Sequence, residues 1–178
     1  KIKADNPNIA IRHIFASALR YFWVENNYKS YPKKTPEFVS SYDEFKKYLD
    51  LEPETLKNYL CKIIPNPLDS PLAEDDTKLD PNNFGWTEHL FNEEYGRMKI
   101  AVDEFNEDNT HMGKSFQKIQ QSGSNLSSSE RKKLLNSANK AEGVISTIEN
   151  TETLDFLSAH NIIPKYGFPV DTVELMPI

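Results

Sequence analysis

Apolar residues near the start of the chain recur at steps of three and four, which is the spacing of one helix face. The apolar positions of this first helix are Ile11, Ile14, Phe15, Ala18, Leu19, Phe22 and Trp23. We expect the helix to end near Glu25–Asn27, and the prolines that follow predict a loop.

Ser41, with Glu44 three residues later, predicts a capping box at the start of a second helix. Pro53 falls in the first turn of a third, and these two helices have apolar faces at Phe45, Tyr48, Leu49, Leu56, Tyr59, Leu60, Ile63 and Ile64.

A longer pattern occupies the second half of the chain. Steps of four and three, with polar Asn109 among them, link Phe91, Tyr95, Met98, Val102, Phe105, Asn109, Met112, Phe116 and Ile119. A second such series follows a Ser/Gly turn and comprises Leu134, Ala138, Ala141, Ile145 and Ile148, with a capping box predicted at Ser127 and Glu130. Two heptad helices joined by a short turn predict an antiparallel hairpin, with Gly113 as the place where the first arm bends or breaks. The alternative is that both arms are core helices of an ordinary bundle, because heptads also suit bundles.

These patterns predict a mainly α fold: a helical domain with a long antiparallel coiled-coil hairpin and a short C-terminal strand. The expected parts are an N-terminal helical subdomain (1–64), a proline-rich acidic linker (65–85), the hairpin (86–150) and a C-terminal segment (151–178). That last segment contains a short helix ended by Pro164, a turn and an alternating stretch typical of a strand. The turn is formed by Tyr166, Gly167, Phe168 and Pro169. A lone strand needs a sheet to join, and the chain begins with Lys rather than Met, so we interpret it as a piece of a longer protein.

Charge divides the chain more sharply than its net value of −6 indicates. Residues 1–34 hold seven Lys/Arg and two Asp/Glu, whereas residues 35–110 hold seven and eighteen. Residues 111–165 are again slightly basic, with seven and five. Because phosphate repels acidic surfaces, a nucleic-acid contact belongs to the first or the third of these segments. The alternative is that all three are simply solvated faces.

Candidate chemistry is sparse. Cys61 is the single cysteine, which excludes an internal disulfide and a multi-cysteine zinc site and fits a reducing cytoplasm. No apolar run approaches the roughly 20 residues of a membrane span, so no membrane contact is expected. "MGKS" at 112–115 resembles the end of a phosphate-binding loop, but the glycine required five residues earlier is Asp108. Asp108 and His111 share a helix face, yet one pair cannot complete a metal shell, and we expect both to be exposed. The chain is therefore predicted to be inactive alone.

Both ends of the chain carry a family resemblance. "IIPKYGFPVDTVEL" resembles a stretch of large bacterial superfamily-two DEAD/DEAH-box helicases that end in a cysteine-rich zinc-binding domain and serve in DNA repair and phage defence. "DNPNIAIRHIFASALRYF" resembles the segment that follows the arginine-rich motif of the second motor domain in that family. Ile11 departs from the family's tandem arginine, which puts a phosphate contact there in doubt. The resemblance implies an accessory segment between motor and zinc-binding domain, in which ATP, Mg²⁺ and DNA belong to the parent helicase and the segment holds no cofactor.

Phosphate contacts are predicted at two places. Arg12, His13 and Arg20 lie off the apolar stripe, on what should be the exposed face of the first helix, and Arg131, Lys132 and Lys133 crowd the start of the second arm. Tyr166 and Phe168 could stack on a base or could be buried anchors of the strand. A different function is a protein-interaction module of a multi-subunit phage-defence or repair complex, in which the acidic middle or the hairpin docks a partner. In either case the remaining domains of the parent chain are expected neighbours.

Overall fold

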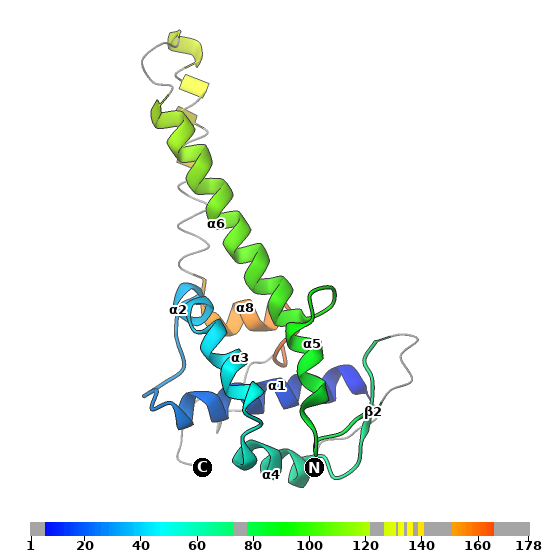
Figure 1. Ribbon diagram of the computed structural model, residues 1–178. Coiled ribbons are helices and arrows are strands. Elements are labelled where there is room, and N and C mark those ends of the chain that lie inside the picture. Colours follow the sequence, from blue (N-terminus) through cyan, green and yellow to red (C-terminus); the bar gives the residue numbers. More distant parts are fainter. Residues whose placement is uncertain are drawn as a thin grey trace.

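The fold is taken from a computed structural model that describes residues 6–72, 78–121, 127–130, 132–133, 135–136, 139–140 and 151–165, with the backbone alone for 112–121. It is mainly helical, as predicted, and the described residues include a small antiparallel sheet (Figure 1). The helices with described bounds are α1 (Pro7–Glu25), α2 (Thr35–Ser40), α3 (Tyr42–Asp50), α4 (Glu54–Ile63), η1 (Phe84–Thr87), α5 (Glu88–Phe91), α6 (Arg97–Gln121) and α8 (Thr153–Ala159). In the described part, no helix is long and apolar enough to cross a membrane.

Helix α1 is the centre of the core. The Asn6 side chain caps its start by accepting hydrogen bonds from the Asn8 and Ile9 amides, and Pro7 occupies the first turn. The helix ends at Glu25, as predicted, and Asn27 follows with a φ of 62°. All seven residues of the predicted stripe are buried, and Ala10, Ala16 and Tyr21 are buried as well. Burial therefore covers more than one face of α1, which contacts α3, α4 and β1.

The predicted loop after α1 contains the short helix α2, which the sequence reading missed. Thr35, at its start, hydrogen-bonds to the Thr151 carbonyl oxygen through its backbone N–H (3.0 Å) and its Oγ1 (2.8 Å). The Thr153 amide donates to the Lys33 carbonyl oxygen in return. A contact across more than 100 residues thus fixes the start of α2, and periodicity cannot reveal such a contact.

The capping box at Ser41 was predicted wrongly, although Ser41 does stand at the N-cap of α3. Its hydroxyl donates to the Phe38 carbonyl oxygen (2.7 Å) and so bonds back into α2. For the capping box predicted at Ser127 and Glu130, one of the two hydrogen bonds is confirmed: the Ser127 Oγ accepts a 3.4 Å hydrogen bond from the Glu130 amide.

The segment predicted as a linker contains ordered structure. Strand β1 (Leu68–Asp69) pairs antiparallel with β2 (Lys78–Leu79), and Leu68 lies opposite Leu79. Both leucines are buried, as is Phe84, so the segment contributes to the core. One buried cluster joins residues from both sides of 65–85, including Trp23 and Trp86. The division of the chain into separate domains stays a prediction, but the buried core extends across the predicted boundary at 65–85.

The predicted first arm is not one helix, and its break is not at Gly113. Helix α5 ends at Phe91, and Asn92 leaves the helical conformation with ψ 139°. The Asn92 Oδ1 accepts a 2.8 Å hydrogen bond from the Glu94 amide, which stabilises a turn before α6. Gly113 lies inside the continuous helix α6. The heptad spacing thus runs across a helix end, because the Asn92 side chain accepts a hydrogen bond from a backbone amide and stabilises a turn after α5.

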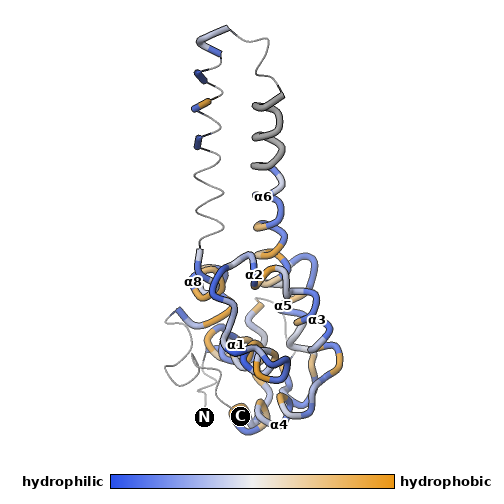
Figure 2. The backbone as a smooth tube through the Cα atoms, turned by 90° about the vertical axis from the view of Figure 1, so that its left-hand side faces the viewer, coloured by the Kyte–Doolittle hydropathy of each residue, from blue (hydrophilic) through white to orange (hydrophobic). Residues whose placement is uncertain are grey.

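Helix α6 rises from the helical body and projects away from it (Figure 1). Its base packs in the core through buried Met98, Ala101, Val102 and Phe105. After Phe105 the described side chains as far as His111 are exposed, except half-buried Asn109. Figure 2 shows the same change, with hydrophobic positions gathered in the body. Most of the second arm lies outside the described residues, so the coiled-coil hairpin remains an expectation.

The last described element, α8, is the short helix predicted before Pro164, and its Phe156 and Leu157 are buried. The predicted turn and strand, including Tyr166, Gly167, Phe168 and Pro169, lie outside the described residues. Pro164 itself is half-buried, and its carbonyl oxygen accepts a hydrogen bond from the Ser158 hydroxyl (3.2 Å).

Candidate functional site

The basic residues predicted on α1 are less exposed than expected. Arg12, His13 and Arg20 are each half-buried, because neighbouring elements cover α1 on several sides. The Nε atoms of Arg12 and Arg20 are buried and have no hydrogen-bond partner in the described part of the chain. Their terminal nitrogens are the atoms left to meet a ligand. The expectation of a fully exposed basic face is therefore corrected to a half-buried one.

His13 does not add positive charge to this face at neutral pH. Burial lowers the pKa of His13 below its ordinary value of 6.5, because the charged imidazolium loses hydration. The histidine can still donate a hydrogen bond as a neutral ring. Its predicted role as a phosphate contact is thus restricted to hydrogen bonding at neutral pH.

The structure adds an arginine that sequence reasoning missed. Arg97, the first residue of α6, donates from Nη2 to the Asn8 Oδ1 (2.8 Å) and from Nη1 to the Asn161 carbonyl oxygen (2.8 Å). It thereby ties together the starts of α1 and α6 and the turn after α8. No sequence signal could have found this role, since Asn8 and Arg97 are 89 positions apart.

Arg97 also lies within electrostatic reach of Arg12. Its pKa is lowered chiefly by burial and further by the positive charge of Arg12. Arg97 nevertheless stays protonated, because the guanidinium group is too basic to titrate in the ordinary pH range. The junction of α1 and α6 therefore holds two like charges close together.

Carboxylates do not compensate these charges in the described residues. The ion pairs there involve Lys78 with Asp69, Lys99 with Glu93 and Asp103, and His160 with Glu104. None of the described arginines, Arg12, Arg20 and Arg97, takes part in them. Within the described residues these arginines therefore take part in no ion pair, although the chain has 27 Asp and Glu against 21 Lys and Arg.

The second predicted basic cluster lies elsewhere. Lys132 and Lys133 are exposed, and Arg131 lies outside the described residues. The short helical pieces that contain them lie at the far end of the projection from α1 (Figures 1 and 2). The structure thus does not bring the two predicted basic clusters together.

A small cavity of about 160 Å³ lies where the base of α6 meets α8 and the start of α2. Its polar lining includes Glu104, Asp108 and His160, while Phe105 and Phe156 form its apolar wall. The His160 Nε2 is 3.5 Å from the Glu104 Oε2, and its ring lies over Phe156 with centroids 4.7 Å apart. These groups can attract a cation, but within the described ranges no group of three or more His, Cys, Asp or Glu residues could hold a metal ion.

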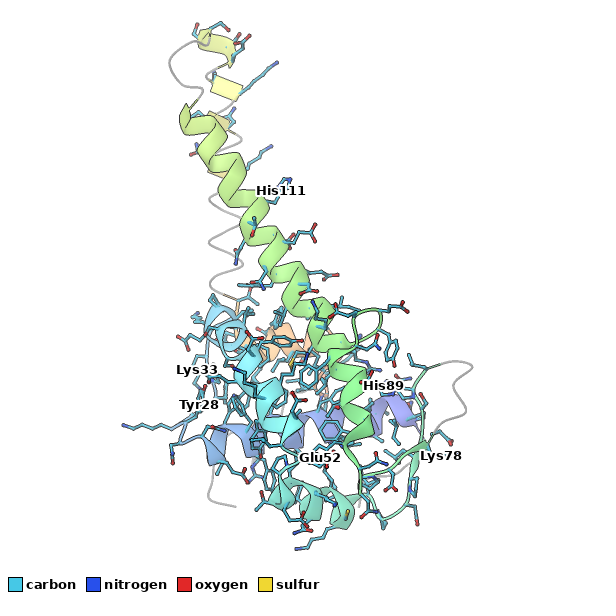
Figure 3. The ribbon with its side chains drawn as sticks, in the orientation of Figure 1. Tyr28, Lys33, Glu52, Lys78, His89 and His111 are labelled. Atoms are coloured by element: carbon cyan, nitrogen blue, oxygen red, sulfur yellow. The ribbon has the colours of Figure 1, made fainter. Side chains whose placement is uncertain are left out.

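Asp108 and His111, the one sequence candidate for a metal pair, are both exposed, as expected. His111 extends from the projecting part of α6, well away from the labelled residues of the body (Figure 3). Cys61 is half-buried on α4, and its Sγ lies 3.2 Å from the Asn82 Oδ1. None of these three residues takes part in the described contacts of Arg12, Arg20 or Arg97.

Comparisons of the chain with protein-family models, with curated proteins and with solved structures find no match. The best-defined chemical capacity of the described residues is the binding of an anion by half-buried arginines.

Proposed function

We propose that this chain is an accessory, non-motor segment of an ATP-dependent DNA helicase and that α1 helps the parent protein engage nucleic acid. The observation that carries this proposal is the set of arginines without a carboxylate partner in the described residues: Arg12, Arg20 and Arg97. Guanidinium groups suit phosphate because their planar donors match its oxygens. The resemblance of both chain ends to zinc-domain DEAD/DEAH-box helicases supports the same assignment.

In this proposal the segment neither binds a cofactor nor runs a reaction. ATP and Mg²⁺ belong to the parent motor, and the segment supplies electrostatic contacts and holds neighbouring domains in place. The charge distribution supports this division, because residues 1–34 are basic while residues 35–110 are strongly acidic. A DNA strand would be drawn to α1 and repelled by the acidic middle. A cytoplasmic location belongs to the same proposal.

The test is charge reversal in the full-length parent helicase. Arg12→Glu combined with Arg20→Glu should weaken DNA binding and lower DNA-stimulated ATP turnover, because both changes repel phosphate. Lys47→Glu is the matched control, since Lys47 is an exposed α3 residue. Unchanged DNA affinity and ATP turnover in the double variant would remove the proposal.

A second candidate function is a protein-interaction module without direct DNA contact. The observation in its favour is the exposed acidic surface of α6, formed by Asp103, Glu104, Glu107 and Asp108. We further propose that the second arm packs antiparallel against α6 as a coiled coil, because its heptads continue the pattern. Distances between spin labels at Asn106 and Lys140 would test the hairpin. The isolated chain separates the two functions: steep salt-dependent DNA affinity favours the first, and no DNA affinity favours the second.

A further inference from the structure

The junction of α1 and α6 contains two arginines from distant parts of the sequence, Arg12 and Arg97. Asn8 and Arg12 are four residues apart on α1, so their side chains share one face of the helix. The Asn8 Oδ1 accepts a 2.8 Å hydrogen bond from the Arg97 Nη2. The guanidinium of Arg97 therefore lies against the same face as Arg12.

Arg97 is held in place but not saturated. Its Nη1 and Nη2 each donate one hydrogen bond, to the Asn161 carbonyl oxygen and to Asn8. A guanidinium has five N–H donors in a fixed plane, so others remain for a ligand. Arg12 brings further donors, and in the described residues its buried Nε has no hydrogen-bond partner.

Placing two guanidinium charges together in a half-buried site is unfavourable unless an anion neutralises them. The described carboxylates do not do so, because their ion pairs engage lysines and a histidine. Because no ion pair of the described residues neutralises Arg12 or Arg97, an external anion would account for the arrangement. A phosphate group fits it, because its several oxygens can accept from two arginine forks at once.

We propose that Arg12 and Arg97 jointly bind one phosphate group at the junction of α1 and α6, with Asn8 and the Asn161 carbonyl oxygen orienting Arg97. The proposal deepens the proposed function and rests on it, since it takes that phosphate to belong to a nucleic-acid strand. The basic charge of residues 1–34 favours a polyanion over an isolated carboxylate of a protein partner.

The first experiment measures the affinity of the 178-residue chain for a single-stranded oligonucleotide against salt concentration. Arg12→Gln is the variant to use. Replacing Arg97 would also remove its hydrogen bond to the Asn161 carbonyl oxygen, whereas the buried Nε of Arg12 has no hydrogen-bond partner in the described residues. We expect Arg12→Gln to reduce the slope of log affinity against log salt by about 0.7, the value for one phosphate contact. Lys47→Gln is the control for loss of one charge. Equal slopes in the wild type and Arg12→Gln would overturn the proposal.

The second experiment follows thermal unfolding without nucleic acid. At constant ionic strength, inorganic phosphate should raise the Tm of the wild type more than that of Arg12→Gln. Without phosphate, Arg12→Gln should melt at a higher temperature than the wild type, because it relieves repulsion with Arg97. A lower Tm would contradict the expected repulsion between Arg12 and Arg97 and with it the proposal.

The two experiments distinguish failure of the phosphate site from failure of the proposed function. An oligonucleotide that binds with an unchanged slope in Arg12→Gln removes the phosphate site and leaves the proposed function standing. An oligonucleotide that does not bind, while inorganic phosphate still protects the wild type selectively, removes the proposed function and leaves the phosphate site. A poly-glutamate peptide that binds more tightly than the oligonucleotide would make the occupant a carboxylate and overturn the phosphate assignment.

Discussion

Gly96 shows how one residue sets the connection that places Arg97. It is buried between α5 and α6, and its amide donates to the Asn92 carbonyl oxygen (2.9 Å). An added Cβ would lie 2.4 Å from the Asn92 nitrogen and 2.7 Å from the Leu90 carbonyl oxygen. Both are backbone atoms, which cannot move aside as the end of a flexible side chain can. This close approach requires a glycine.

We therefore predict that Gly96→Ala lowers the free energy of unfolding by roughly 1–3 kcal/mol, the usual range for overpacking. Urea unfolding measures the change. Gly85→Ala is the matched control, because the nearest atom to its added Cβ is the Asn83 side-chain oxygen at 3.0 Å, which can shift. Equal losses in the two variants would contradict the proposed backbone clash.

Burial of His13 makes the stability of the fold depend on pH. Because its pKa is lowered in the folded protein, the unfolded chain takes up a proton at higher pH than the folded one does. The contribution of His13 to stability is complete above the ordinary pKa of 6.5 and decreases as the pH falls below it. Unfolding midpoints in urea at pH 7.5 and pH 5.5 should thus differ less in His13→Gln than in the wild type. The same pH dependence in both proteins would show that His13 is not the group responsible.

At the scale of elements, α2 and α8 are joined by a buried bridge. Thr35 is 1% exposed and donates to the Thr151 carbonyl oxygen from Oγ1, whereas Thr153 is fully buried and its Oγ1 has no partner in the described residues. Valine has nearly the same shape as threonine and lacks the hydroxyl. The two threonines therefore form a matched pair for testing the bridge.

Thr35→Val should lower the free energy of unfolding by about 1 kcal/mol, the typical net worth of one hydrogen bond. Thr153→Val should be neutral or slightly stabilising, because it removes a buried hydroxyl without a described partner. Chemical denaturation of both variants checks the pair. A larger loss in Thr153→Val than in Thr35→Val would contradict the assigned contacts.

At the scale of the whole molecule, one core spans both sides of residues 65–85. The chain has two tryptophans, Trp23 on α1 and Trp86 on η1, and both are fully buried. We predict that these two regions unfold together, because they share the same buried cluster.

The measurement uses Trp23→Phe and Trp86→Phe, each of which leaves a single tryptophan as a probe. In both variants the loss of fluorescence signal should coincide with the loss of helical circular dichroism. Comparing two probes within one variant removes any effect of the substitution on stability. A tryptophan transition displaced from the helical one in either variant would indicate two independently stable domains.

The sequence by itself determined where most helices form and how charge is distributed. Steps of three and four predicted α1, α3 and α4, because a helix face depends on residues only a few positions apart. Asn92, followed by two acidic residues, carried a signal for the end of α5, but the heptad spacing concealed it. The basic N-terminal segment was likewise readable from composition.

Only the tertiary structure decided which of these features meet. Arg97 contacts Asn8 across 89 positions, Thr35 contacts Thr151 across 116, and the strands that pair through Leu68 and Leu79 are too short to leave a periodic pattern. Such contacts depend on how helices pack, and packing is a cooperative property of the whole core rather than of any local spacing. Periodicity thus located Arg12 on its helix, and tertiary packing placed Arg97 against the same helix face.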